Sequence, residues 1–403
     1  MQRRQILLGS GAALLPAQTA PATEADWQAV AAAYPLRPGL VYVNAANVCP
    51  APKSVLAEHE RYLRDFEADP SFQNRAKFAG LREKSRAAAA RLLGASVEEL
   101  AFTRNTSEAT NIIVHGLELN AGEEVVLVGD NHPSNLDSWR NQAQRRKFKI
   151  VEVPPTQLAS GPGELLDKVR AAFTAKTKVV SITHVTSTTG VLYPAREIAA
   201  AARAQGIWCH VDGAQSAGMI DVNLQAIGCD SFATSLHKWM MGPLEAGLLY
   251  VRQEQQRRVW PSIVSVGYAG ESSQGARAFE SYGQRDDARL AAIAAACEWL
   301  DKLGMVKVEA RVRQLAQHVM GRLADSRKVR LRTNRAAALS AGVVKVDLPG
   351  VADLRPLDAR LYAQQGMAFS VTASGAMRGI RIAPHIYNTV AQMDQIADAL
   401  LRA

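Results

Sequence analysis

Between residues 99 and 250, short apolar runs alternate with helical segments in a regular order that few folds accommodate. The apolar runs are EVVLVG, KIVEVP, KVVSITHV, IWCHVDGA, SFATS and AGLLYV. Strands that alternate with amphipathic helices are typical of a parallel sheet whose strands are joined by crossover helices. The sequence therefore predicts an α/β fold, with a largely parallel sheet flanked by helices.

The 403 residues can bury a large core and favour two domains over one. A helical stretch over about 54–93 precedes the alternating region, and a long helix over about 286–302 follows it. Residues 262–281 are polar and rich in glycine, which predicts a long functional loop. We expect a large domain over residues 23–300, whose N-terminal segment contributes to the small domain, and a smaller α+β domain over residues 301–403.

Residues 1–22, MQRRQILLGSGAALLPAQTAPA, have the pattern of a cleavable export signal. Arg3 and Arg4 precede an apolar run that is too short and too interrupted by glycine to span a bilayer. The paired arginines resemble a twin-arginine signal. We expect a periplasmic protein with no membrane attachment after cleavage; if the segment is an ordinary basic terminus, the protein stays cytoplasmic.

The balance of charges argues against a nucleic-acid partner. Lys and Arg number 47 against 38 Asp and Glu, a formal net charge of +9, and the cations are scattered in small groups such as Arg145-Arg146-Lys147. This pattern favours a small anionic ligand or a solvated face. The four cysteines have no spacing typical of metal ligands, so no metal site is expected.

Two charged side chains follow neighbouring strands of the predicted sheet. Asp212 ends the run IWCHVD, and Lys238 comes just after SFATS, about one βαβ repeat later. Ligands of open α/β sheets bind at the carboxyl ends of the strands, so both side chains can face one crevice. A lone ammonium among apolar residues is costly unless it has an ion partner, a depressed pKa or a covalent role.

Other polar residues occupy similar positions, and each is a weak signal alone. The segment NTSEATN can start a helix whose free N–H groups, with the hydroxyls of Thr106 and Ser107, bind phosphate, although plain N-capping explains it as well. His132 and Ser187 follow two further strands, and Arg381 lies in a late strand. Together these residues meet the needs of pyridoxal phosphate (PLP): a lysine for an imine, a carboxylate, a phosphate site, a flat partner, a donor to the phenolic oxygen and an arginine for the substrate.

The motifs HVDGAQSAG, SLHKWMMGP, NTSEATN and RIAPHIYNT resemble those of the class V aminotransferase family of fold-type I PLP-dependent enzymes. This family includes cysteine desulfurases, kynureninase and isopenicillin N epimerase-like proteins, and GQRDDA and HIYNT look closer to the last of these. The resemblance covers nearly the whole chain after residue 22. It implies a homodimer with its site at the subunit interface.

The resemblance also implies a role for each candidate residue. Lys238 would hold PLP as a Schiff base and move protons at the substrate α-carbon, while Asp212 would pair with the ring nitrogen. His132 would stack on the ring, and Arg381 would bind the substrate carboxylate.

The remaining candidates would bind the edge of the cofactor. Gln215 and, more weakly, Ser187 would contact the phenolic oxygen. The phosphate would be bound by Thr106, Ser107, Ser235 and His237. The partner subunit completes that site in relatives from a Glu-x-x-Gly-Thr-like segment, where this chain offers Gln284 instead.

A missing cysteine narrows the reaction. The segment FSVTASGAMRGIRIAP lies where desulfurases carry their persulfide-forming cysteine, and it contains none, which disfavours a desulfurase of the usual mechanism. We expect a PLP-dependent enzyme that acts on an amino acid, or on a peptide or natural product containing one, by transamination, epimerisation or side-chain modification. A C–S lyase without a catalytic cysteine and a non-catalytic PLP-binding protein stay open as alternatives. A nucleotide-binding protein is disfavoured because no GxGxxG or GxxxxGK[ST] follows a predicted strand.

Overall fold

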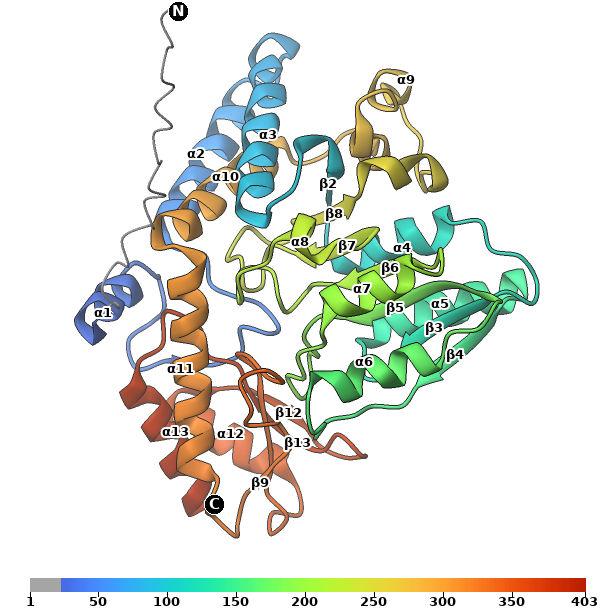
Figure 1. The fold of residues 1–403 in the computed structure, drawn as a ribbon. Helices are drawn as coiled ribbons and strands as arrows, with labels where there is room; N and C mark the ends of the chain where they lie inside the picture. The colour runs from blue at the N-terminus through green and yellow to red at the C-terminus, as the bar shows by residue number, and fades with distance from the viewer. Residues whose placement is uncertain (1–22) are drawn as a thin grey trace, which may run out of the picture.

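The computed structural model describes residues 23–403, so the predicted export signal lies outside the described residues. Two bodies are visible, a large one around a central sheet and a smaller one that carries the C-terminus (Figure 1). Within residues 23–403, no helix has the length and apolar character needed to cross a membrane.

The central sheet has seven strands in the order β2-β8-β7-β6-β5-β3-β4. The strand β8 is antiparallel to both of its neighbours, and the other adjacent pairs are parallel. The six apolar runs of the sequence are strands of this sheet, which confirms the predicted α/β class, whereas β2 was not predicted. The strands are β2 (Leu100–Thr103), β3 (Glu124–Val128), β4 (Lys149–Val153), β5 (Thr177–Thr183), β6 (Trp208–Asp212), β7 (Ser231–Ser235) and β8 (Gly247–Val251).

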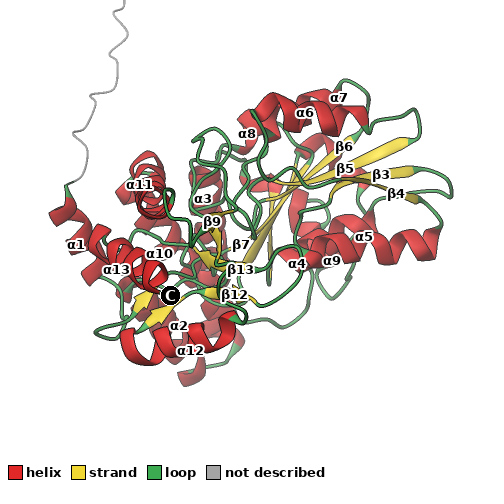
Figure 2. Cartoon of the chain, turned by 90° about the horizontal axis from the view of Figure 1, so that it is seen from below, coloured by secondary structure: helices red, strands yellow, loops and turns green. Residues whose placement is uncertain are grey.

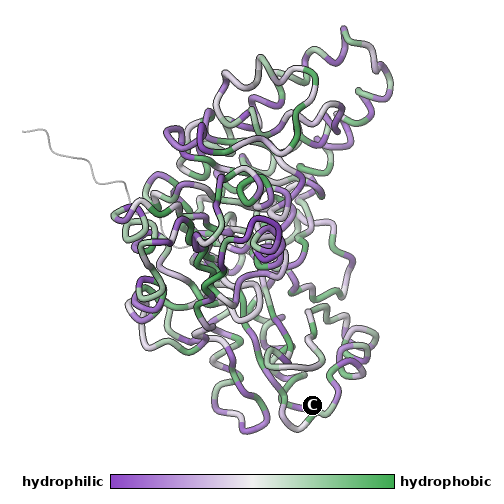
Figure 3. Tube along the Cα trace, turned by 90° about the vertical axis from the view of Figure 1, so that its right-hand side faces the viewer, coloured by the Kyte–Doolittle hydropathy of each residue, from purple (hydrophilic) through white to green (hydrophobic). Residues whose placement is uncertain are grey.

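Helices cover both faces of this sheet, as Figure 2 shows. One face carries α4 (Thr106–Gly116) and α5 (Pro133–Arg146), and the other carries the helices α6 (Pro162–Ala171), α7 (Ala195–Arg203) and α8 (Leu224–Ile227). The inner strands β6, β7 and β8 are buried along their whole length because helices cover both of their faces. Figure 3 shows the same division, with hydrophobic residues inside and hydrophilic residues on the outer turns.

The helical stretch predicted over 54–93 is two helices, α2 (Lys53–Ala68) and α3 (Phe72–Leu93). Pro70 follows the end of α2, and Ser71 caps α3 by accepting a hydrogen bond from the Asn74 N–H at 3.2 Å. The long predicted helix is α10 (Asp287–Leu303), which packs against both (Figure 1). Residues 262–281, predicted as a long loop, also contain the short helix α9 (Tyr268–Glu271) and a 3-10 helix (Gly275–Glu280).

The smaller body has its own buried core. An antiparallel sheet of order β12-β13-β10-β9 packs against three helices, and Val41 and Val43 from the start of the chain join that core. The predicted division at residue 300 falls near the end of α10. The elements are β1 (Val41–Tyr42), β9 (Arg330–Leu331), β10 (Val344–Asp347), β11 (Met367–Ala368), β12 (Ser370–Thr372), β13 (Gly379–Ile382), α1 (Glu24–Ala32), α11 (Met305–Leu323), α12 (Leu354–Gln365) and α13 (Val390–Arg402).

Candidate active site

Asp212 and Lys238 lie at the carboxyl edge of the central sheet, as the sequence predicts for neighbouring strands. Asp212 is the last residue of β6, and β7, which pairs with it in parallel, ends three residues before Lys238. The chain turns sharply after Lys238, where the Met241 N–H donates to the Lys238 carbonyl oxygen at 2.9 Å. Lys238 therefore belongs to a short turn whose backbone is held by a hydrogen bond, not to a long loop.

A cavity of about 170 Å³ opens at this edge. Its lining contains seven of the residues predicted for the site, together with three that were not predicted. The predicted residues are Thr106, Ser107, His132, Asp212, Ser235, His237 and Lys238, and the others are Asn105, Ser134 and Ala214. Residues scattered over more than a hundred positions thus meet in one small volume.

One end of the cavity is formed by the start of α4. Asn105 caps this helix, because its Oδ1 accepts a hydrogen bond from the Glu108 N–H at 3.0 Å. The Thr106 N–H donates to Ser235 Oγ at 2.9 Å, and the two hydroxyl oxygens lie 2.7 Å apart. His237 Nδ1 is buried and has no hydrogen-bond partner among the described residues. Hydroxyls, a helix N-terminus and an orphan imidazole nitrogen together suit an anion.

The other end holds a buried carboxylate and a buried amine. Asp212 accepts a hydrogen bond from the Ala214 N–H at 3.0 Å, which fixes the carboxylate. Burial raises the pKa of Asp212, and it lowers the pKa of Lys238, which the Arg381 charge lowers further. Each group partly offsets the shift of the other, since their charges are opposite. The lowered pKa favours the neutral, nucleophilic form of Lys238.

His132 caps α5 and faces the same cavity. Its Nδ1 accepts a hydrogen bond from the Ser134 N–H at 3.2 Å, so the neutral ring carries its proton on Nε2. Burial, and then the Lys238 charge, lower the pKa of His132, which keeps the ring neutral. A neutral imidazole is flat and polarisable, as a stacking partner must be.

Arg381 lies in β13 of the smaller body and does not line this cavity, but it contacts the segment that follows β5 at the same edge of the central sheet. Its Nη1 donates to the Ser187 carbonyl oxygen and its Nη2 to Asn44 Oδ1, both at 2.9 Å. Its Nε is buried and has no partner within residues 23–403. An arginine held at two nitrogens, with donors left over, can bind a carboxylate.

Besides Arg381, three further predicted residues do not line this cavity. Ser187 contacts Arg381 through its carbonyl oxygen, not its hydroxyl. The Gln215 amide donates to the Ala46 carbonyl oxygen at 3.0 Å and accepts from Trp239 Nε1 at 2.7 Å, which leaves one N–H for a ligand. Gln284 lines a separate cavity beside Arg285 and Arg289.

Sequence reasoning missed Asn44, although a signal for it exists. Asn44 follows the strand-like run LVYV, which is the same position, just after a strand, that identified the other polar residues. Its partner Arg381 lies 337 residues further along the chain, so only the folded structure shows the contact.

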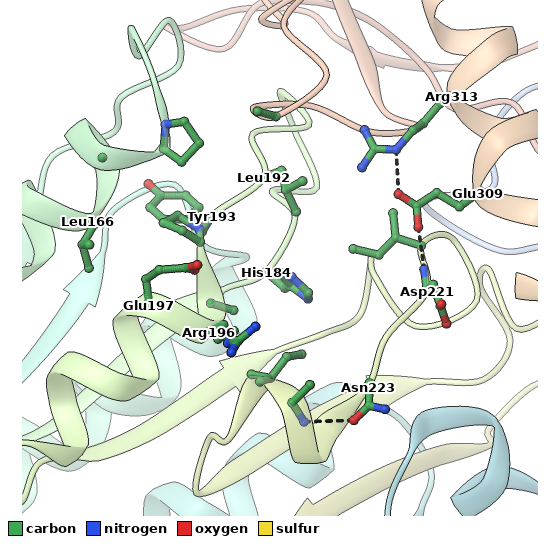
Figure 4. A pocket seen from close by; sticks show the side chains of 18 residues that line it. Leu166, His184, Leu192, Tyr193, Arg196, Glu197, Asp221, Asn223, Glu309 and Arg313 are labelled. Atoms are coloured by element: carbon green, nitrogen blue, oxygen red, sulfur yellow. Dashed lines mark hydrogen bonds and ion pairs between the residues drawn. The ribbon is translucent and has the colours of Figure 1, made fainter. Parts of the chain in front are cut away.

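A second cavity, of about 540 Å³, lies among α6, α7, α8 and α11 (Figure 4). His184 lines it, and burial lowers the pKa of this histidine to about 4. Glu309 accepts hydrogen bonds from Arg313 Nε at 2.7 Å and from the Asp221 N–H at 2.8 Å on one side of this cavity (Figure 4). No residue predicted for the site lines it, so it is separate from the active-site cavity.

The first cavity fits PLP. The cofactor needs an anion site, a carboxylate for its ring nitrogen and an amine within one small volume, and the orphan His237 nitrogen and the buried pair Asp212 and Lys238 provide them. The fold and the cavity together define a PLP-dependent enzyme of fold type I.

The chain belongs to the aminotransferase class-V family, whose model matches residues 41–396. It is 29% identical to isopenicillin N epimerase of Streptomyces clavuligerus, over 93% of this chain and 98% of that protein. It is 24% identical to a probable cysteine desulfurase of Methanothermobacter thermautotrophicus, over 91% of this chain and 95% of the relative. A solved structure of the cystine C-S lyase C-DES with cysteine persulfide shares the fold, with a TM-score of 0.82 at 21% identity over 89% of this chain and 97% of that one.

Proposed function

We propose that this PLP-dependent enzyme moves a proton at the α-carbon of an amino acid, free or within a peptide or natural product, whose carboxylate binds Arg381. One observation carries the proposal: Arg381 of the smaller body donates a hydrogen bond to the Ser187 carbonyl oxygen, in the segment that follows β5, so it lies at the same edge of the central sheet as the Lys238 amine. An amino acid bound between them would have its carboxylate at Arg381 and its α-carbon near the Lys238 amine.

The residues of the cavity divide the work. PLP, when bound, supplies the electron sink that makes an α-proton acidic. Thr106, Ser235 and His237 would hold its phosphate, and Asp212 would face its ring nitrogen. The Lys238 amine, which burial keeps readily deprotonated, takes the α-proton at Nζ and returns it. His132 lines the same cavity and would stack on the cofactor ring.

We propose epimerisation as the reaction, in the isopenicillin N epimerase-like branch of the family. The similarity to isopenicillin N epimerase extends over nearly both whole chains. Residues 369–378, which connect β11 to β13, contain no cysteine, and all four cysteines are buried elsewhere. Proton removal and return at one carbon require no such thiol.

Isotope exchange tests this proposal. The purified enzyme, loaded with PLP, is incubated with a panel of L-amino acids and small peptides in D₂O, and the products are resolved by chiral chromatography and NMR. We expect deuterium at the α-carbon together with the opposite stereoisomer, and neither with Lys238→Ala. Borohydride should fix PLP to the peptide that contains Lys238 only in the unsubstituted enzyme.

Other products would contradict epimerisation specifically. Pyruvate with sulfide or a persulfide from cysteine or cystine would indicate a C–S lyase, and a keto acid formed without racemisation would indicate transamination. PLP binding without any exchange or product across the panel would favour a non-catalytic PLP-binding protein.

We also propose that the enzyme is a periplasmic homodimer. Arg3 and Arg4 before a short apolar run support export by a twin-arginine route. Four large apolar side chains exposed on residues 260–266 support a subunit contact. Fusion of residues 1–22 to a reporter that works only after export of the folded protein tests the first point.

A further inference from the structure

Lys345 lies in the middle of β10 with its side chain 1% exposed. Among the described residues, no carboxylate forms an ion pair with it, because Asp347 on the same strand pairs with Arg378 and Arg332 instead. A buried ammonium without an ion partner is costly, so a gain elsewhere must offset it.

The Lys345 ammonium closes the open end of the β12–β13 pair. Its Nζ donates to Thr372 Oγ1 at 3.0 Å and to the Gly379 carbonyl oxygen at 2.9 Å. Thr372 and Gly379 are the last paired residues before the connecting loop 373–378. Gly379 adopts φ +140°, and a Cβ there would lie 2.2 Å from the Val346 carbonyl oxygen and 3.1 Å from Lys345 Cε, so only glycine leaves room for this arrangement.

Lys345 is also the direct cross-strand neighbour of Arg381. The register pairs Arg381 with Lys345 on β10 and with Ser370 on β12, so these three side chains share one face of the sheet. Burial, and then the Arg381 charge, lower the pKa of Lys345 to about 8, which Asp347 opposes and Arg332 reinforces. A second positive charge thus lies beside the arginine that we propose to bind the substrate carboxylate.

We propose that Lys345 is a positioning residue that makes the site select ligands carrying a carboxylate. Its ammonium fixes the root of loop 373–378 and adds positive potential beside Arg381. The inference rests on the proposed function, in which Arg381 binds the substrate carboxylate. It concerns the choice between amino acids and the corresponding amines, not the reaction at the α-carbon.

The test compares two ligands that differ by one carboxylate. The PLP-loaded enzyme is titrated with L-leucine and with 3-methylbutylamine, followed by visible absorbance, in the unsubstituted protein and in Lys345→Met, Lys345→Arg and Arg332→Met. We expect the unsubstituted enzyme to prefer L-leucine at least tenfold. Lys345→Met should reduce this preference at least fivefold by weakening L-leucine alone, while the other two variants keep it. Arg332→Met is the matched control, because it removes a cation of the same sheet that does not contact Thr372 or Gly379.

The outcomes separate this inference from the proposed function. No preference for L-leucine in the unsubstituted enzyme would overturn the proposed role of Arg381, and with it the role of Lys345. A preference that Lys345→Met leaves unchanged, or equal weakening of both ligands, would overturn the inference about Lys345 alone.

Two measurements keep the test decisive if Lys345→Met does not fold. Thr372→Val keeps the charge of Lys345 but removes one of its contacts. Amides of residues 373–378 should then exchange with D₂O faster, and the preference for L-leucine should fall, but less than fivefold. Unchanged exchange would overturn the positioning of the loop. The second measurement is competition between L-leucine and 4-methylpentanoate, which does not titrate between pH 7 and 9. Binding of this carboxylate should weaken from pH 7 to pH 9 in the unsubstituted enzyme, as Lys345 loses its charge, but not in Lys345→Arg. Equal pH profiles would overturn the electrostatic part.

Discussion

Asn44 connects an early segment of the chain to Arg381, the residue that we propose to bind the substrate carboxylate. Its Oδ1 accepts a hydrogen bond from Arg381 Nη2 at 2.9 Å, while its backbone forms a bridge with Ala383 on the same segment as that arginine. The Asn44 side chain and the Ser187 carbonyl oxygen together therefore set the direction of the guanidinium. Loss of this contact would leave a buried charged donor unsatisfied.

Asn44→Ala should weaken substrate binding more than turnover. A hydrogen bond to a charged group contributes about 1.5–3 kcal/mol, so we expect KM to rise roughly tenfold to a hundredfold while kcat changes little. Steady-state kinetics with the best substrate of the panel measure both constants. Asn47→Ala, an exposed asparagine on the same segment, is the control; a fall in kcat with an unchanged KM would contradict this role.

At the residue scale, the sequence identifies the residues whose chemistry is unusual, such as Asp212 and Lys238, because each follows a strand at the edge where ligands bind. It does not identify Asn44 or Lys345. Their roles depend on partners from distant segments, Arg381 for one and Thr372 for the other, and no local pattern reports such a contact.

At the scale of elements, α4 shows how one cap can serve both stability and binding. Asn105 closes the first turn and lines the cavity at the same time. A substitution of Asn105 that removes the oxygen acceptor affects the stability of the helix. A substitution that adds a charge affects the binding of an anionic ligand.

Two substitutions of Asn105 should separate these effects. Asn105→Ala removes the cap and should lower the unfolding free energy of the apoprotein by about 1 kcal/mol. Asn105→Asp keeps an oxygen acceptor, so stability should hold, but the added negative charge should weaken PLP binding at least tenfold by repelling its phosphate. Urea unfolding and fluorescence titration with PLP measure the two quantities. Equal PLP affinities for Asn105→Asp and the unsubstituted protein would place the phosphate elsewhere.

The elements themselves differ in how well the sequence predicts them. Most of the strands from β3 to β8 carry apolar runs because helices bury both faces of the sheet, although the edge strand β4 is only partly buried. The strand β2 and the strands of the smaller body have only two to four residues each, too few to show a period. The break between α2 and α3 is marked by Pro70, which ends a helical pattern that the apolar spacing alone would continue.

At the scale of the whole molecule, three buried histidines make stability depend on pH. Burial lowers the pKa of His184 and His385 to about 4 and that of His210 to about 3. The unfolded chain takes up these protons near pH 6.5, whereas the folded protein does not. The unfolding free energy therefore falls as the pH falls below 6.5.

We expect the unfolding free energy of the apoprotein to fall by up to about 4 kcal/mol per pH unit between pH 6.5 and about 4, the slope for three protons. Urea unfolding at intervals of half a pH unit measures this slope. His184→Gln should reduce it by about a third, because one of the three groups is gone. A flat profile down to pH 4.5 would show that these side chains take up protons in the folded state.

The exposed loop 260–266 predicts the oligomeric state of the protein in solution. Val266 is 98% exposed and Trp260 64% exposed, which is unusual for side chains of this kind unless a partner covers them. Val266→Asp should convert the proposed dimer to a monomer, as measured by sedimentation. Val306→Asp places the same charge at another exposed valine, on α11, and should leave the dimer intact. A monomeric unsubstituted protein would contradict the proposal.

The contacts of the segment 43–49 can form only in a certain order during synthesis of the chain. Cys49 donates its backbone N–H to the His237 carbonyl oxygen beside Lys238, and its Sγ lies 3.8 Å from the Tyr387 hydroxyl, 338 residues further along. At roughly 5–20 residues per second, the ribosome makes the second partner about 20–70 s after the first. The contacts of residues 43–49 are therefore complete only after Tyr387 has been made, so the part of the site that holds Arg381 forms later than the cavity around Lys238.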